Sequence, residues 1–122
     1  MNYSGPPNLK KWGNYVRRLS RLLYNDTISY LIFDFLVDKG LIEVNTFAQI
    51  HSLNNHYDIR AALNKVKDHG LLHRISMRLD NFKSDYSKVI GLSPDEISSD
   101  KNSVEVYYFD VDLKFILKAR LQ

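Results

Sequence analysis

The chain has 122 residues, of which 44% are hydrophobic and 25% charged, so it can form one folded domain with a normal core and is not a disordered tail. It contains no cysteine, which excludes disulfides, thiolate nucleophiles and cysteine-based zinc sites. The net charge of +3 is modest, and the most apolar run, residues 28–37, is too short to cross a bilayer and contains Asp34, so we expect no membrane segment.

The charges are segregated along the chain. Residues 1–24 contain several cations and no acid, and residues 56–78 are net positive, whereas residues 25–55 and 79–106 are net negative. Segregation of this kind suits a surface that contacts phosphates or an acidic protein. On charge alone, an ordinary solvated surface is the favoured explanation.

Residues 1–8, with Gly5 followed by two prolines, are expected to form a flexible leader, and residues 9–122 a single domain. Residues 9–24 predict a helix with Trp12, Val16 and Leu19 on its apolar side. The helix carries five cations and no acid: Lys10, Lys11, Arg17, Arg18 and Arg21. A core helix with a solvated face and a basic helix near nucleic acid explain this pattern equally well.

The next helix is expected at residues 27–39, after a break and a cap at residues 25–27 and before a stop at Gly40. Its apolar positions repeat at helical spacing, with Tyr30 and Phe33 broadening the apolar face, and it should be the central buried helix. Residues 41–44 suit a short strand. A third helix is expected at about 46–52, where Thr46 and Gln49 fit a capping box and Phe47, Ile50 and Leu53 face inward.

Residues 56–70 predict one amphipathic helix, with Asn55 at its N-cap, a stripe of Ile59, Leu63 and Val66, and Gly70 as its left-handed stop. The period then changes to strict alternation over residues 72–79, which indicates a half-buried strand. Residues 103–111 are the most β-prone run and should pair with that strand in antiparallel fashion.

Between these two strands lies an acidic insert, residues 80–102, in which Ser93 and Pro94 predict the start of a short helix that carries Ile97. A last amphipathic helix is expected at residues 113–121. The sequence therefore predicts an α+β, mainly helical fold: a winged helix-turn-helix with extended N-terminal and C-terminal helices and a long inserted wing.

Catalytic chemistry is not indicated. His69 and His73 are four residues apart, but Gly70 between them should end the helix, so they would not share a face as metal ligands do. There is no glycine-rich phosphate loop and no H-E-x-x-H motif. We expect no enzyme activity, no metal or other cofactor and no small-molecule substrate.

Three stretches, in order, carry a resemblance to a known family. The first is residues 9–18, LKKWGNYVRR, followed by Leu23 and Tyr24; the second is the helix DIRAALNKV at 58–66, followed by the strand at 72–78; the third is VEVYYF at 104–109, before the helix at 113–121. Together they resemble the N-terminal winged-helix domain of the alpha subunit of general transcription factor IIE, whose archaeal relative is transcription factor E. The family continues into a zinc ribbon with four cysteines, which this chain lacks, and its simplest members have a shorter insert.

The resemblance implies a non-catalytic transcription initiation factor domain in the nucleus. It implies docking on the RNA polymerase II clamp and on a winged-helix beta subunit near promoter DNA, with weak DNA binding and no strong sequence preference, in support of preinitiation complex assembly and promoter opening. Two rival hypotheses stay open. One is a sequence-specific DNA-binding winged-helix regulator; the other is an interaction module of another polymerase-associated complex.

The candidate contact residues follow from these hypotheses. Besides the five cations of the first helix, the nucleic-acid candidates lie on the helix at 56–70 and the strand after it: Arg60, Asn64, Lys65, Lys67, Arg74 and Arg78. The candidate partner-binding residues lie at the end of the chain: Tyr107, Leu113, Ile116, Leu117 and Leu121. For the partner set, burial in the core is the competing interpretation.

Overall fold

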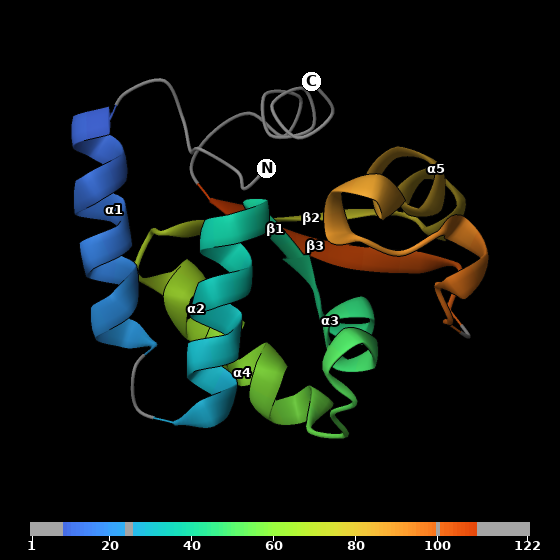
Figure 1. The fold of residues 1–122 in the computed structure, drawn as a ribbon, viewed down its shortest axis with the longest axis horizontal. Coiled ribbons are helices and arrows are strands. Elements are labelled where there is room, and N and C mark those ends of the chain that lie inside the picture. Colours follow the sequence, from blue (N-terminus) through green and yellow to red (C-terminus); the bar gives the residue numbers. More distant parts are fainter. Residues whose placement is uncertain (1–8, 24–25, 100, 110–122) are drawn as a thin grey trace.

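The computed structural model describes residues 9–23, 26–99 and 101–109, which form an α+β fold of helices around one antiparallel sheet (Figure 1). The helices are α1 (Leu9–Leu22), α2 (Thr27–Lys39), α3 (Val44–His51), α4 (His56–Asp68) and α5 (Leu79–Ile90), with a 3-10 turn, η1, at Pro94–Glu96. The strands are β1 (Leu41–Glu43), β2 (Leu72–Arg78) and β3 (Ser103–Phe109). The expected leader and the expected helix at 113–121 lie outside the described residues.

Helix α2 begins and ends where its local signals predict. The Asp26 carboxylate accepts a hydrogen bond from the backbone N–H of Ser29 at 2.8 Å, which satisfies one of the free amides of the first turn. Gly40 ends the helix with φ 84°, a left-handed conformation that favours glycine. One expectation is wrong: Tyr30 is 61% exposed and does not broaden the apolar face.

Helix α3 is capped by a residue that the sequence did not single out. The carboxylate of Glu43 accepts hydrogen bonds from the backbone N–H groups of Asn45 (2.8 Å) and Thr46 (3.0 Å). The predicted capping box of Thr46 and Gln49 is therefore wrong, because Thr46 already lies inside the helix and its hydroxyl donates back to the Glu43 carbonyl. Ile50, expected to face inward, is 36% exposed.

Helix α4 uses its predicted apolar stripe: Ile59, Leu63 and Val66 are fully buried. Asn55 stands at the N-cap but makes no side-chain capping bond, and its amide donates to Asp58 at 3.4 Å instead. The helix ends two residues before Gly70, which has φ 78° and turns the chain into β2. The helix is thus two residues shorter than predicted, and Gly70 supplies the left-handed turn that follows it.

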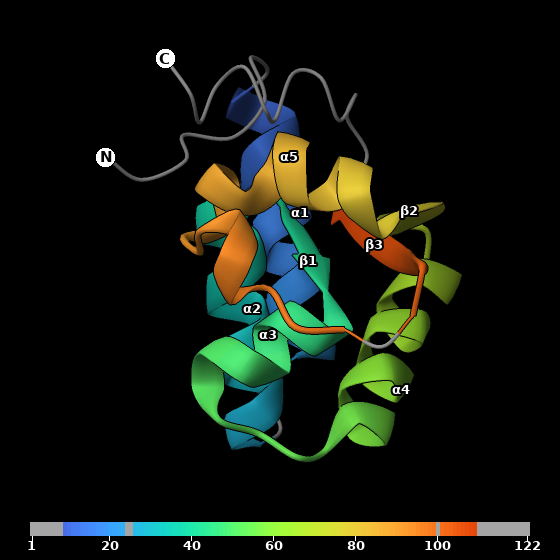
Figure 2. The same ribbon diagram turned by 90° about the vertical axis from the view of Figure 1, so that its right-hand side faces the viewer.

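The sheet has the strand order β1-β3-β2, and both pairings are antiparallel. The predicted pairing of the last two strands is confirmed, with an unbroken register from Leu72 opposite Phe109 to Arg78 opposite Ser103. In both views α4 and α5 lie on opposite sides of the sheet (Figure 1, Figure 2). The central strand β3 is therefore covered on both faces, and it buries Val104, Val106 and Tyr107.

The insert is more ordered than predicted. It contains helix α5, which the sequence interpretation missed, with an apolar side of Phe82, Tyr86, Val89 and Ile90. Their spacing of i, i+4, i+7 and i+8 is the signal that could have revealed the helix, together with Gly91, which ends it with φ 85°. The helix was missed because it follows β2 directly, with no side-chain cap between them.

The second half of the insert matches its prediction in part: the short helix is the 3-10 turn η1, and Ile97 follows it instead of lying within it. Ser93 and Glu96 form a reciprocal capping box around η1, and Ile97 is buried in the core. Gln49 of α3 holds this segment in place, because its amide donates to the Glu96 carbonyl and its side-chain oxygen accepts from the Ser98 N–H at 3.3 Å. The insert is therefore attached to the body of the fold at η1 as well as at α5.

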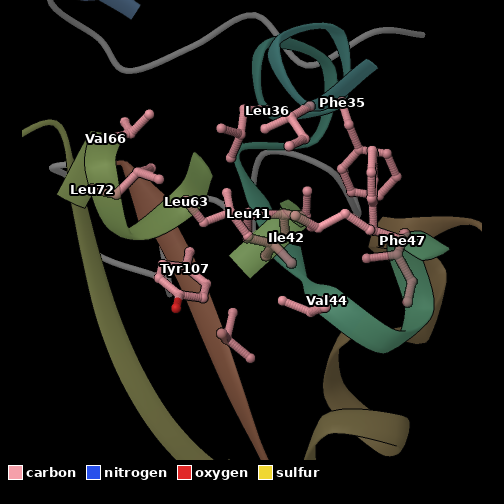
Figure 3. Close-up of a cluster of buried hydrophobic side chains, with 14 of the residues drawn as sticks. Phe35, Leu36, Leu41, Ile42, Val44, Phe47, Leu63, Val66, Leu72 and Tyr107 are labelled. Atoms are coloured by element: carbon pink, nitrogen blue, oxygen red, sulfur yellow. The ribbon is translucent and has the colours of Figure 1, made fainter. Parts of the chain in front are cut away.

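A single core cluster joins all these elements. Figure 3 shows side chains of α2, β1, α3, α4, β2 and β3 converging on one another. Phe35 and Phe47 meet edge to face, with ring centroids 5.4 Å apart, which locks α3 against α2. In the same cluster, Leu63 and Val66 pack α4 against the sheet, which determines which α4 side chains face outward.

We expect Phe82→Ala to lower the free energy of unfolding by about 3–5 kcal/mol, because Phe82 is fully buried and stacks on Tyr86 with centroids 5.9 Å apart. Urea unfolding followed by circular dichroism measures this. The control is Lys88→Ala on the exposed side of α5, which should change the value by less than about 0.5 kcal/mol. Equal stability of the two variants would show that α5 is not part of the cooperative core.

Candidate nucleic-acid interface

The outer face of α4 is the surface that the packing leaves open. By the helical period, Tyr57, Ala61, Asn64 and Asp68 lie opposite the buried stripe of α4. Tyr57 is 79% exposed and is the most exposed large hydrophobic side chain of the described residues. The middle of the α4 face therefore offers an aromatic ring, a methyl group, an amide and a carboxylate, and its cations lie to either side.

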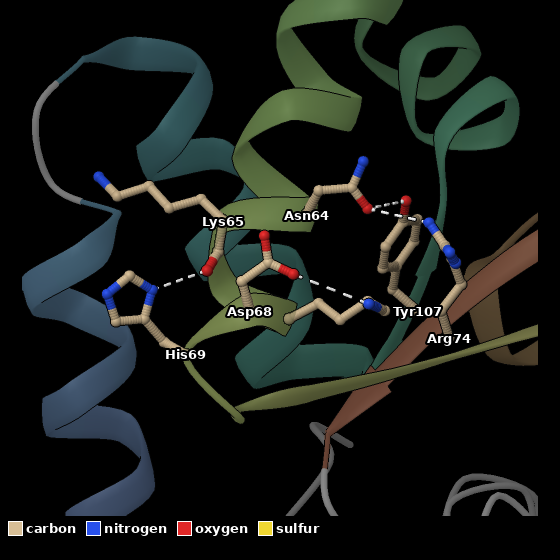
Figure 4. A network of polar contacts seen from close by, with 7 residues as sticks. Asn64, Lys65, Asp68, His69, Arg74 and Tyr107 are labelled. Carbon is tan, nitrogen blue, oxygen red and sulfur yellow. Dashed lines mark hydrogen bonds and ion pairs between the residues drawn. The ribbon is translucent and has the colours of Figure 1, made fainter.

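Asn64 and Arg74, both predicted to contact nucleic acid, are bound to each other. The Oδ1 atom of Asn64 accepts hydrogen bonds from the Tyr107 hydroxyl at 2.7 Å and from the Arg74 guanidinium at 3.2 Å (Figure 4). Because both partners donate to it, the amide oxygen of Asn64 must face the sheet. The polar triad Asn64–Arg74–Tyr107 therefore joins α4, β2 and β3, and it uses the acceptor that Asn64 would need to read an adenine.

At the C-terminal end of α4, α1 brings a second set of cations. Arg18 of α1 donates to the His69 carbonyl at 3.4 Å, and His69 Nδ1 lies 2.8 Å from the Lys65 carbonyl. Lys65 is exposed, whereas Lys67 lies 3.8 Å from the Asp68 carboxylate (Figure 4). The structure therefore groups Arg18 and Lys65 at one corner, which we call the α1–α4 corner.

The other cations of α1 have different positions. Arg17 and Arg21 are exposed on the same helix, and the Arg17 guanidinium lies 3.4 Å from the Asn14 amide oxygen. The side chains of Lys10 and Lys11 lie outside the described residues. The exposed arginines of α1 are compatible with phosphate contact as well as with plain solvation.

On the opposite flank of α4, Arg60 lines a polar hollow of about 320 Å³ between α4, the start of α3 and the ends of β2 and β3. The charged groups around it balance: Arg60 and Lys101 face Glu43 and Glu105. Arg78, at the end of β2, is exposed and lies 3.9 Å from the Asp80 carboxylate. The structure therefore separates Arg60 from the cations of the α1–α4 corner.

Glu43 is a buried carboxylate that lines the hollow. Burial raises the pKa of its carboxyl above the ordinary value of 4.5, against the opposing effects of its two backbone hydrogen bonds and of nearby His56. Its burial follows from its capping position, where both oxygens point into the first turn of α3. Glu43 is therefore a structural carboxylate at the base of the site.

Of the five candidate partner-binding residues, Tyr107 alone lies within the described residues. Tyr107 is fully buried and bonded to Asn64, so its assignment to an exposed partner surface is wrong. The physical reason is that β3 is the central strand and is covered on both faces. The other four candidates, Leu113, Ile116, Leu117 and Leu121, lie outside the described residues.

Tyr57 is a functional candidate that the sequence interpretation missed. The signal was available, because the position lies opposite Ile59 and Leu63 on the helical wheel. Within the described ranges, no cluster of three or more histidine or carboxylate side chains could hold a metal ion, and no helix is long and apolar enough to cross a membrane. Comparisons with protein-family models, curated proteins and solved structures found no match to this chain.

We expect the contribution of Glu43 to stability to fall as the pH rises. A raised pKa means that the folded state holds the proton more tightly than the unfolded state, so the contribution is complete below the ordinary pKa of 4.5 and is lost as the pH passes through the raised value. The measurement is the free energy of unfolding of the wild type minus that of Glu43→Gln, from about pH 4 to about pH 8. A difference that stays constant or grows with pH would contradict this account.

Proposed function

We propose that this chain is a winged-helix domain with a non-catalytic, docking role in transcription initiation. The topology is compatible with this fold: α2, β1, α3, α4 and β2 follow one another, β3 comes after α5 and η1, and the strand order is β1-β3-β2. In a winged helix, α4 would take the position of the recognition helix. Helix α1 is then an N-terminal extension, and α5 with η1 occupies the place of the wing loop.

The observation that carries the functional proposal is the hydrogen bonding of Asn64. Asparagine reads adenine through its oxygen and its amide together, and here the oxygen already accepts two hydrogen bonds from the sheet. Along the rest of the α4 face, Tyr57 lies in the first turn and Ala61 in the next, and the face ends in Asp68, whose carboxylate repels phosphate. Such a face favours protein docking and loose phosphate contact over base readout.

The sequence resemblance supplies the setting of the proposal. A domain similar to that of the alpha subunit of general transcription factor IIE would act in the nucleus, with RNA polymerase II and a winged-helix beta subunit as partners. It would contact promoter DNA weakly. Arg60 lies apart from the α1–α4 corner, in a hollow that Glu43 and Glu105 also line, so loose phosphate contact falls to Arg18 and Lys65 at the corner. The two sites form no continuous array of base-reading side chains.

The rival proposal is a sequence-specific regulator, and duplex binding separates the two. We expect weak binding to any duplex, with less than about tenfold variation between sequences, against roughly 1,000-fold or more for a specific regulator. Arg60→Ala should leave this binding nearly unchanged under the docking proposal. A regulator would lose about 1–3 kcal/mol at one base position.

Fluorescence anisotropy over a range of salt concentrations makes this measurement. The comparison variant is the double substitution of Arg18→Ala and Lys65→Ala at the α1–α4 corner, both exposed. If each contacts one phosphate, the slope of log K against log salt should become less negative by about 2 units. A discrete sequence enriched from a random pool, with its preference relaxed by Arg60→Ala, would overturn the docking proposal.

We also expect the tagged chain to retain RNA polymerase II subunits and a winged-helix beta-like protein from nuclear extract at moderate salt. Mass spectrometry of the bound fraction is the readout. Tyr57→Ala is the informative variant, because it removes the most exposed aromatic ring of the α4 face without touching the core, and Tyr30→Ala on α2 is its matched control. If both variants retain the partners, the docking surface lies elsewhere than on α4. If the wild-type sample retains no polymerase subunits, the proposal is contradicted.

A further inference from the structure

The outer edge of β2 is an open strand edge. β2 pairs with β3 on one side, and no strand of the described ranges pairs with its other side, which lies at the rim of the sheet (Figure 2). Residues 73–76 are all exposed. The opposite edge strand, β1, is only three residues long and fully buried. Within residues 9–23, 26–99 and 101–109, one edge of the sheet is therefore buried and the longer edge is exposed.

The usual protections of an edge strand are weak here. Proteins block open edges with proline, bulges or outward-pointing charges. β2 has no proline, and its seven consecutive pairs with β3 contain no bulge. Its two arginines lie over one face of the strand: Arg74 bonds to Asn64 on the α4 side of the sheet, and Arg78, still largely exposed, lies by Asp80 at the end of the strand. Between them Ile75, 41% exposed, stands at the middle of the edge.

The side chains of β2 indicate what kind of strand fits beside it. Arg74, Ser76 and Arg78 alternate with Ile75 and Met77, so one face of the strand is cationic and the other apolar. The strand that β2 already binds on its inner side has the complementary pattern. In β3, Val104 and Val106 lie opposite Met77 and Ile75, and Glu105 between them lies opposite Ser76 on the arginine face.

A second copy of β2 does not fit this edge well. Antiparallel pairing of two copies centred on Ser76 would place Arg74 of one opposite Arg78 of the other, and like charges directly opposite one another destabilise a sheet. β2 contains no acid, so no register of two copies forms a cross-strand ion pair with Arg74 or Arg78. Charge complementarity therefore favours an acidic occupant from another protein.

We propose that the outer edge of β2 binds an extended segment of a partner protein as a fourth strand, in which acidic residues alternate with apolar ones. Backbone hydrogen bonds along the edge supply the affinity. Acidic side chains beside Arg74 and Arg78, and apolar ones beside Ile75 and Met77, supply the specificity. The site is separate from the outer face of α4, so it stands whether or not the α4 face docks a partner.

The test uses the full chain and blocked hexapeptides of alternating residues. A valine–glutamate peptide should bind about tenfold more tightly than a valine–lysine peptide, since two cross-strand ion pairs at up to about 1 kcal/mol each suffice for that ratio. Isothermal titration calorimetry gives the affinities. Amide chemical-shift changes in the ¹⁵N-labelled chain should gather on residues 72–78.

Modified peptides and three variants of the chain serve as controls. Two N-methylated peptides should be compared, one methylated at the odd positions and one at the even positions. Only one of them should lose binding, because only one set of N–H groups donates to the β2 edge. Ile75→Glu and Arg78→Glu should each weaken binding of the valine–glutamate peptide at least about fivefold. Ile50→Glu, at the exposed isoleucine of α3, should not.

Two results would overturn the proposal. Equal binding of both N-methylated peptides would show plain charge attraction, without strand addition. Concentration-dependent dimerisation in sedimentation velocity that Ile75→Glu abolishes would show that the edge pairs with a second copy.

Discussion

The hydrogen bond from the Tyr107 hydroxyl to Asn64 joins the two parts of the fold on which the rest depends. Tyr107 lies on the central strand, with Ile42 on one side and Arg74 on the other, and its ring is fully buried. Removal of Asn64 would remove this bond, and a hydrogen bond of this kind typically contributes about 0.5–1.5 kcal/mol to stability. The bond therefore fixes α4 against the sheet at one turn, and the turn that it fixes decides which residues α4 presents outward.

The same bond explains why the candidate site differs from its sequence-based prediction. Asn64 and Arg74 are ten residues apart on different elements, and each has the chemistry of a nucleic-acid contact. Whether such a residue faces DNA or its own protein depends on tertiary placement, which no local pattern contains. Tyr107 is a similar case, because its burial depends on the packing of α4 against its face of the sheet. Tyr57, in contrast, could have been assigned to the outer face from the helical period alone.

For the fold, the predictions succeeded where a local signal exists. Helix α2 begins after the cap at Asp26, within the predicted break, and ends at Gly40 as expected. The alternation of apolar and polar residues in β2 predicted a strand, and its pairing with β3 is confirmed. They failed where a side chain acts outside its usual position. Glu43 caps α3 although glutamate is not among the preferred capping residues, and α5 starts directly from a strand. The winged-helix topology was predicted from the order of elements, and the strand order is compatible with it.

The placement of residues 79–102 between β2 and β3 also has a kinetic consequence. In most hairpins two strands meet through a turn of a few residues, so the hairpin forms early and locally. Here the ends of β2 and β3 are brought together across a helix and η1, and closing so long a connection costs about 2 kcal/mol more than closing a two-residue turn. The sheet should therefore assemble after the helices, with low φ-values in β2. β2, whose outer edge stays open, would then be among the last elements to fold.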